Sequence, residues 1–357
     1  MVHYRPILLA KRGELTALKA LPAPVWTNMT PVMQVPPREW DFDKSAFKKT
    51  LEDHLTDLPK KLATATKGHS AYVDVSLLDS TGPVFGGSHA LAWLIDEAAT
   101  HDLHLIPFVQ SNSDARALTA AADVHARRAT GIGIRLRVED WVSINAGALP
   151  AVLSRLGLAA TDADVFVDVE REFSVVVAAA VTTELSAQDG AYTFRARAVG
   201  GAGFPDTTGL AKGLSEFSRE DWKLFASTYR ARFATGATTP DFFDYAVNNP
   251  ASEVVIDPKL LSISALFRYT TDDAWLIAKG DLFKGSGGRG IGGAAMLPPL
   301  TLLRAHPTYT VPIRTATDDW IDAVVATVGS PGNPEMWRRW ATERHLAVVA
   351  HQIASPI

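Results

Sequence analysis

The stretch "ADVFVDVEREFSVVVAAAVTTELSA" (163–187) decides the fold that the sequence predicts. Residues 163–169 alternate valine with other side chains, which is typical of a β-strand. Residues 171–187 have the length and apolar spacing of a helix. A strand followed by a helix is the repeating unit of proteins that are built around parallel strands. The same unit recurs on both sides of this stretch.

The strand-and-helix unit occurs eight times before residue 251. The short β-branched runs that predict strands are 4–9, 29–35, 71–79, 103–110, 131–138, 163–169, 192–199 and 240–247. Helical segments follow the first seven runs, and they include one long amphipathic helix at 43–65 and another helix at 218–234. Eight repeats predict an α/β fold, a closed TIM-like (β/α)8 barrel, rather than an open doubly wound sheet.

The rhythm of the sequence changes after residue 251. Runs 261–270 and 273–280 predict a β-hairpin around the turn "TDD". A glycine-rich loop, a segment interrupted by prolines and two helices follow it. We therefore expect two parts: a barrel over residues 1–251, and a C-terminal appendage of hairpin and helices over residues 252–357, packed on the barrel.

The composition is that of a globular protein without a general attraction to nucleic acid. The 357 residues are 47% hydrophobic and 21% charged, and the formal net charge is −4. Nucleic acid is therefore not an expected partner. Cysteine is absent, which excludes disulfides and thiolate metal sites. The longest apolar run, 173–185, is shorter than the ~18–20 residues that cross a bilayer, so no membrane association is expected and the cytoplasm is the expected location.

The loop "KGDLFKGSGGRGIGG" (279–293) contains the pattern G-x-G-x-x-G and three basic residues. A dinucleotide site needs a helix directly after these glycines and an acidic residue about 20 positions further on. Here Pro298 and Pro299 are expected to interrupt the helix, and the next acidic residue is Asp318. We expect a connecting loop, with Lys279 as a candidate contact of an anion-binding lid over the barrel.

Strand residues alternate between the barrel lumen and the surrounding helices. In the fifth predicted strand the aliphatic residues belong against helices, so Arg135 and Arg137 should point inward. In the sixth, Asp168 and Glu170 should share the inward face. The same alternation predicts three more charged residues in the lumen: Asp74, Arg195 and Arg197.

These inward charges allow two interpretations. Isolated buried charges are costly, so the groups should pair with one another, and the result would be a structural ion-pair network. The alternative is a site for an anionic ligand at the carboxyl ends of the strands, where active sites of this fold lie, because guanidinium groups match phosphate and carboxylate. The residues expected nearest to those ends are Gln110, Arg137, Asp168, Glu170, Arg197, Asp244 and Tyr245. No complete metal motif is present, no metal site is predicted, and the sequence identifies no cofactor.

The chain resembles the "beta protein" family, which is named from T-even bacteriophages and also found in bacterial genomes. "YRPILLAKRGELTAL" (4–18) is similar to the opening pattern of that family through Tyr4, Pro6, Lys11, Gly13, Glu14 and Leu18. "MTPVMQVPP" (29–37) is similar to its second-strand pattern, with Gln34 where glutamate is common. "FFDYAV" (242–247) resembles an Asp-Tyr motif, and "MWRRWATERHL" (336–346) is similar to its C-terminal pattern.

The resemblance implies a barrel protein associated with phages, prophages and defence systems, without an agreed reaction. The first hypothesis is a component of phage–host conflict that binds an anionic ligand, or a phage or defence-system protein, at the barrel mouth. The second is a hydrolase- or lyase-like barrel enzyme that acts on a phosphorylated or other anionic small substrate. The catalytic candidates are Asp168, Glu170, Asp244 and Tyr245. The ligand-binding candidates are Lys11, Glu14, Gln34, Asp74, Gln110, Arg135, Arg137, Arg195, Arg197 and Lys279.

Overall fold

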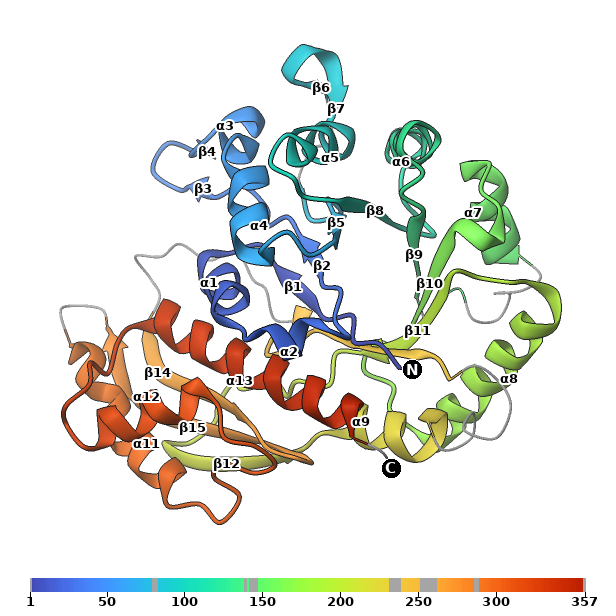
Figure 1. Cartoon of the computed structure of the whole chain (residues 1–357). Helices are drawn as coiled ribbons and strands as arrows, with labels where there is room; N and C mark the ends of the chain where they lie inside the picture. The colour runs from blue at the N-terminus through green and yellow to red at the C-terminus, as the bar shows by residue number, and fades with distance from the viewer. Residues whose placement is uncertain are drawn as a thin grey trace.

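Eight parallel strands form the barrel that the sequence predicts (Figure 1). The structure is a computed structural model that describes residues 2–78, 83–137, 140, 147–230, 239–250, 262–285 and 289–355. The strands, in their order around the barrel, are β1 (Ile7–Leu9), β2 (Val32–Gln34), β5 (Ala71–Asp74), β8 (Leu105–Gln110), β9 (Ile132–Leu136), β10 (Ala163–Asp168), β11 (Ala196–Gly201) and β13 (Asp241–Asp244). Parts of several predicted elements lie outside the described residues, among them Val138 at the end of the fifth predicted strand, residues 231–234 of the predicted helix 218–234, Gly287 in the glycine-rich loop and the boundary between residues 251 and 252.

The residues just before β1 close the barrel. Tyr4 forms parallel bridges to both Met29 and Phe242. The N–H of Arg5 donates to the carbonyl of Phe242 at 2.8 Å, and the N–H of Phe242 donates to the carbonyl of His3 at 3.0 Å. The first and last strands of the sheet are therefore neighbours, which confirms the closed barrel over an open sheet.

Side-chain alternation divides the barrel into a lumen and an outer layer. The lumen is filled mainly by aromatic and aliphatic side chains, namely Ile7, Val32, Tyr72, Ile106, Phe108, Phe166, Ala198, Ala202, Phe243 and Tyr245. The larger outer layer packs the alternate strand residues against the helices. The packed lumen is a core and not a pore, so ligands can approach only at its two ends.

Helices connect the strands and surround the barrel. They are α1 (Arg12–Ala20), α2 (Ala23–Trp26), α3 (Leu51–Leu55), α4 (Leu58–Thr66), α5 (Ala90–Ala99), α6 (Ala115–Arg128), α7 (Leu149–Leu156), α8 (Val175–Ala191) and α9 (Glu220–Leu224), which continues into a π-helical turn (Phe225–Arg230). A small hairpin, β6 (Pro83–Val84) and β7 (Ser88–His89), precedes α5. No helix in the described ranges is both long and apolar enough to cross a membrane.

The prediction of one long helix at 43–65 is wrong. This segment contains a hairpin of β3 (Trp40–Asp41) and β4 (Ala46–Phe47), followed by α3 and α4. The side chain of Thr50 accepts a hydrogen bond from the N–H of Asp53 at 3.0 Å and so caps the start of α3. Pro59 lies in the first turn of α4, where a proline is tolerated, and this divides the amphipathic segment.

The predicted hairpin of the appendage is confirmed as β14 (Ile263–Thr270) and β15 (Ala274–Lys284). A third strand, β12 (Gly213–Ser218), pairs antiparallel with β15 and completes a sheet of order β12-β15-β14. This strand comes from the connection between β11 and α9, so it lies within the range predicted for the barrel. The sequence analysis missed it.

Prolines 298 and 299 begin a helix and do not interrupt one. Helix α11 (Leu297–Arg304) has both prolines in its first turn, where the missing N–H would have no helical partner. A 3-10 turn (Gly292–Met296) leads into it, and α12 (Ala316–Val325) packs beside it. The expectation that these prolines break the helix was wrong.

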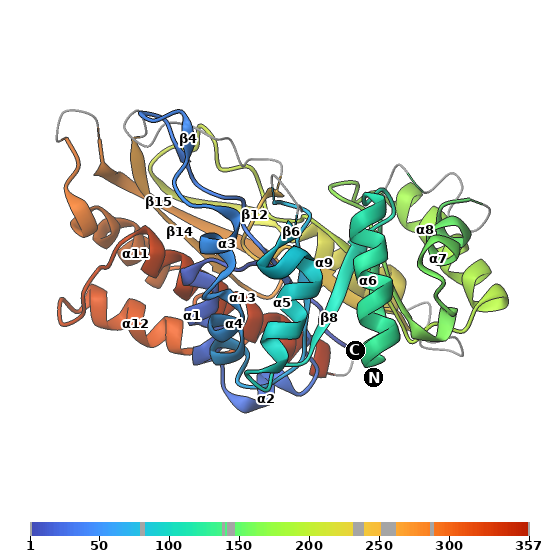
Figure 2. The same ribbon diagram turned by 90° about the horizontal axis from the view of Figure 1, so that it is seen from above.

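The last helix, α13 (Pro334–Ala354), belongs to both parts of the molecule. Leu346, Val349 and Ile353 pack in the barrel core, whereas Trp337 and Ala341 pack in the core of the appendage. The helix contacts α1 on one side and β14 on the other, as Figure 1 shows. It thus takes the place of an eighth barrel helix, and the appendage extends to one side of the barrel (Figure 2).

Candidate functional site at the barrel mouth

Asp168 is the central acceptor at the carboxyl ends of the strands, which we call the barrel mouth. Its Oδ2 accepts hydrogen bonds from Arg135 Nε and from Tyr245 Oη, both at 2.7 Å. Its Oδ1 accepts the N–H of Glu170 at 2.7 Å. Burial opposes the charged form of Arg135, but the carboxylate of Asp168 outweighs this and raises the pKa of Arg135. These contacts confirm that Arg135 and Asp168 point inward, and they give Asp168 a positioning role.

Arg137 and Glu170 form the next layer toward solvent. Arg137 donates from Nε at 2.8 Å and from Nη2 at 2.5 Å to the same oxygen, Oε1 of Glu170. The two side chains are 34% and 30% exposed, so this pair can be reached by a ligand. Glu170 has a φ of 51°, a left-handed conformation that is uncommon for a residue with a side chain. Such conformations are enriched at functional sites.

A polar cavity of about 430 Å³ opens at the carboxyl ends of β5 and β8. Asp74 and Gln110 line it, together with Arg116 from the first turn of α6. The amide of Gln34 donates to Asp74 Oδ2 at 2.9 Å, and the N–H of Ser76 donates to Asp74 Oδ1 at 2.8 Å. The mouth therefore brings together Gln34, Asp74, Gln110, Arg135, Arg137, Asp168, Glu170 and Tyr245.

The predicted inward position of Arg197 is wrong. Its guanidinium donates to the carbonyl of Leu185 at 2.8 Å and pairs with Asp189 at 2.9 Å, both in α8. Arg195 contacts Asp164 and the carbonyl of Thr130 at the amino ends of the strands. Both arginines line a cavity of about 690 Å³ at that end of the barrel. They are therefore far from the mouth, on the opposite side of the aromatic layer in the lumen.

Asp244 does not lie in the mouth beside Tyr245, because adjacent strand residues face opposite sides. Its Oδ1 accepts from Tyr4 Oη at 2.8 Å, and its Oδ2 lies 2.8 Å from His345 Nε2. Burial would raise the pKa of Asp244, but His345 and these hydrogen bonds lower it. His345 Nδ1 lies 3.1 Å from Thr270 Oγ1. Asp244 is thus part of a buried connection between the barrel and the appendage, and it does not lie in the mouth beside Tyr245 as expected.

Lys11 and Glu14 follow β1, next to the appendage. Glu14 is buried, and burial raises the pKa of its carboxyl group. Its Oε1 lies 3.9 Å from Arg338 Nε of α13. Lys279 lies on β15, where its ammonium donates to the carbonyl of Leu210 at 2.6 Å. This hydrogen bond joins β15 to the segment that precedes β12, and the role of Lys279 in a lid stays a prediction.

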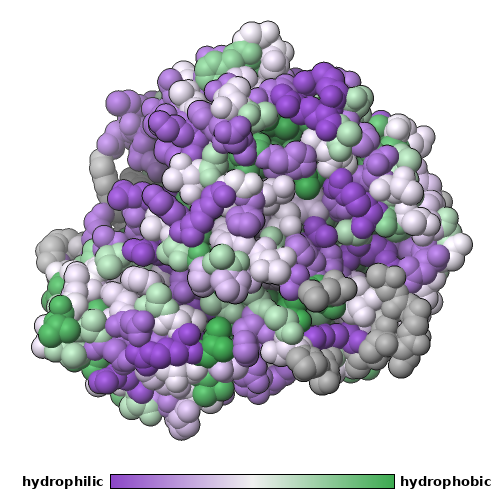
Figure 3. Space-filling model, viewed as in Figure 1, coloured by the Kyte–Doolittle hydropathy of each residue, from purple (hydrophilic) through white to green (hydrophobic). Residues whose placement is uncertain are grey.

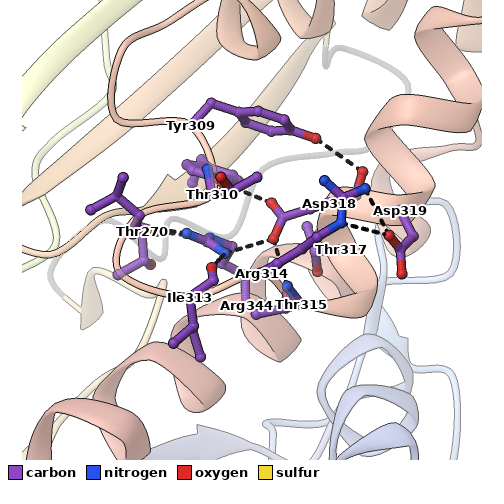
Figure 4. Close-up of polar contacts among 12 residues, drawn as sticks. Thr270, Tyr309, Thr310, Ile313, Arg314, Thr315, Thr317, Asp318, Asp319 and Arg344 are labelled. Carbon is purple, nitrogen blue, oxygen red and sulfur yellow. Dashed lines mark hydrogen bonds and ion pairs between the residues drawn. The ribbon is translucent and has the colours of Figure 1, made fainter.

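A second polar cluster lies wholly inside the appendage (Figure 4). Arg344 donates to the carbonyls of Thr270, Ile313 and Val311 at 2.7 to 2.9 Å and pairs with Asp318 at 2.8 Å. Tyr269 Oη also donates to Asp318 at 2.7 Å. Arg344 and Asp318 are fully buried, and their partners account for their charge. This cluster stabilises the fold and has no access for a ligand.

The sequence analysis missed two arginines that the appendage places beside the mouth. Arg268 of β14 lies over the ring of Phe204, which follows β11. Arg338 of α13 donates to the carbonyl of Val247, which follows β13, at 3.4 Å. No local signal could have placed them there, because the docking of the appendage depends on contacts between distant segments. Within the described ranges, no group of three or more acidic or histidine residues is placed to hold a metal ion.

Known proteins that are similar to this chain include one solved structure and one sequence family. Along nearly its full length the chain is similar to the crystal structure of the N-terminal domain of a candidate aldolase from Bacteroides vulgatus, with 12% identity and a TM-score of 0.38 over 98% of this chain and 97% of that one. No curated protein matches the sequence. The profile of the family described as "Beta protein" matches residues 4–351. The chain therefore belongs to the Beta protein family.

Proposed function

We propose that the barrel mouth binds a small molecule that carries an anionic group. The observation that supports this is the polar cavity at the carboxyl ends of β5 and β8, which is lined by Asp74, Gln110 and Arg116. Ligands of barrel proteins bind at this end of the strands. Pockets with a few converging polar groups are the usual form of small-molecule sites. Arg116 and the accessible Arg137 supply the positive charge for the anion.

The ion pairs at the mouth determine which side chains can accept a new contact from the ligand. Asp168 has its oxygens occupied by Arg135, Tyr245 and a backbone N–H, so it is a poor site for a new contact. Arg137 donates two hydrogen bonds to one oxygen of Glu170, and its side chain is 34% exposed. A ligand anion could therefore approach Arg137, while Asp74 and Gln110 bind the polar body of the ligand.

Thermal shift with a panel of nucleotides, phosphorylated metabolites and dicarboxylates tests this proposal. A ligand at 100 times its Kd should stabilise the native protein by about 2.7 kcal/mol. The shift should be lost in Arg137→Gln and in Asp74→Asn. It should persist in Arg314→Gln, which removes an exposed, paired arginine of the appendage. Folded Arg137→Gln and Asp74→Asn proteins that keep the full shift would place the ligand elsewhere.

A second candidate is an enzyme in which Glu170 acts as the general base. The left-handed conformation of Glu170, its partial exposure and its fixed arginine partner favour this role. Tyr245 and Asp168 would position the site. Glu170→Gln should then abolish turnover of any substrate that the panel identifies, while its binding persists. Unchanged turnover in that variant would show that Glu170 is not the general base.

The biological setting that we propose is phage–host conflict, with a phage or defence-system protein as a further partner. We take this setting from the resemblance to a family that is named from T-even bacteriophages. Cells that express the wild-type chain should differ from cells that express Arg137→Gln in the efficiency of plating of a phage panel. Equal plating of every phage, with equal protein levels, would argue against a defence role.

A further inference from the structure

Arg268 carries a half-buried charge that forms no ion pair among the described residues. It projects from β14, with its guanidinium carbon 5.3 Å from the centre of the Phe204 ring. Its Nε is buried and has no hydrogen-bond partner among the residues that the structure describes. A buried charge without partners is costly, so proteins rarely keep one without a function.

The neighbours of Arg268 increase this excess of positive charge. Arg338 is close enough to repel it, and burial together with this repulsion pushes the pKa of Arg268 far below its usual value. Arginine nevertheless stays protonated in proteins, so the cost appears as lost stability. Glu14 is the acidic residue nearby, and its carboxylate lies beside Arg338. Lys11 also acts on the carboxylate of Glu14.

Arg344 is an arginine with a structural role, and its hydrogen-bond acceptors can be compared with those of Arg268. Both arginines come from the appendage; Arg344 is fully buried, whereas Arg268 is half-buried and only its Nε is shielded from solvent. The guanidinium of Arg344 has three backbone carbonyls and the carboxylate of Asp318 as acceptors, as Figure 4 shows. Within the described ranges, the guanidinium of Arg268 has neither a backbone carbonyl nor a carboxylate as a hydrogen-bond acceptor. The contrast indicates that the acceptor of Arg268 comes from outside this group.

We propose that Arg268 and Arg338 form a second cationic subsite of the mouth, which holds a further anionic group of the ligand, a phosphate or a carboxylate. The inference rests on the proposed function and adds this subsite to the one at Arg116 and Arg137. The two guanidinium groups lie next to the ends of β1, β11 and β13, on the appendage side of the mouth. Guanidinium groups bind phosphate and carboxylate oxygens with paired hydrogen bonds. The ligand would thus bridge the barrel and the appendage.

The first test needs no ligand. Methionine has the length of arginine without its charge, so Arg268→Met should relieve the uncompensated charge and raise the melting temperature of the free protein by roughly 2–4 °C. Arg344→Met is the matched control, and it should lower the melting temperature because it leaves Asp318 buried and unpaired. A lower melting temperature in Arg268→Met would show that another part of the chain neutralises this arginine, and would overturn the proposal.

The second test measures binding by isothermal titration with inorganic phosphate and, separately, with malonate. The wild-type protein should bind one of these anions, and the preferred one identifies the group. Arg268→Met should lose at least tenfold in affinity, and Arg314→Met should keep it. If Arg268→Met binds as the wild type does while Arg137→Gln has lost binding, the mouth site stands and this subsite is wrong. If neither Arg268→Met nor Arg137→Gln affects binding, or if the wild type binds neither anion, the proposed subsite is wrong. The thermal-shift panel then still tests whether the barrel mouth binds a ligand.

Discussion

At the scale of single residues, the fold separates neighbours in the sequence into different environments. Tyr245 points into the lumen and donates to Asp168, whereas Asp244 points outward to His345. The alternation of strand residues makes this separation unavoidable. Two adjacent residues of one sequence motif can therefore lie in two different sites. Tyr245 lies in the mouth, and Asp244 lies in the contact between the barrel and the appendage.

His3 is a residue whose protonation should affect stability. Burial, with the nearby charge of Arg5, lowers the pKa of His3 from 6.5 to about 4. Between pH 6.5 and 4, the imidazole of His3 is protonated in the unfolded chain but neutral in the folded protein. The free energy of unfolding therefore falls as the pH falls through this window. His3→Gln should remove this part of the decrease, which is on the order of 1–2 kcal/mol since the ring is partly exposed. Urea unfolding at pH 7 and at pH 4.5 measures the difference, and parallel curves for the two proteins would contradict it.

At the scale of elements, the alternation of valines was sufficient to predict the strands but not every orientation. The lumen side of β11 carries Ala198 and Gly200, because the neighbouring aromatic residues fill the space there. A Cβ on Gly200 would lie 1.7 Å from the carbonyl oxygen of Phe243. Alanine is compatible with either face of a strand, so the sequence could not show that Arg197 faces α8. Similarly, β12 pairs with β15, which lies far along the chain, and no local pattern indicates this.

The start of α11 gives a test of how proline position controls a helix. Pro298→Ala should change the free energy of unfolding by no more than about 1 kcal/mol, since the proline lies in the first turn and mainly limits the unfolded chain. Leu302→Pro, at an exposed position inside the same helix, should cost about 3 kcal/mol. Denaturant unfolding of both variants makes the comparison. Equal effects would mean that the first turn of α11 does not begin at Leu297.

At the scale of the whole molecule, the barrel and the appendage share elements. Strand β12 leaves the barrel to complete the sheet of the appendage, and α13 packs in both cores. The Asp244–His345 contact joins them through buried polar groups. The eight repeats in the sequence were enough to predict the barrel, whereas the positions of Arg268 and Arg338 beside the mouth depend on this long-range packing.

This shared construction predicts one cooperative unfolding transition. Asp244→Ala should cost about 3–5 kcal/mol, because it leaves His345 and Tyr4 buried without their partner. Circular dichroism and tryptophan fluorescence should give coincident transitions in the wild type and in the variant. Two separate transitions in the wild type would instead show that the barrel and the appendage are independent folding units.

The position of α13 also has a consequence for the order of synthesis. The ribosome makes β1 and α1 long before α13, and α13 packs on α1. During translation, the surface of α1 that α13 will cover stays exposed until α13 has been made. Chaperones that shield apolar surface therefore have access to this side of α1 throughout the synthesis of the barrel.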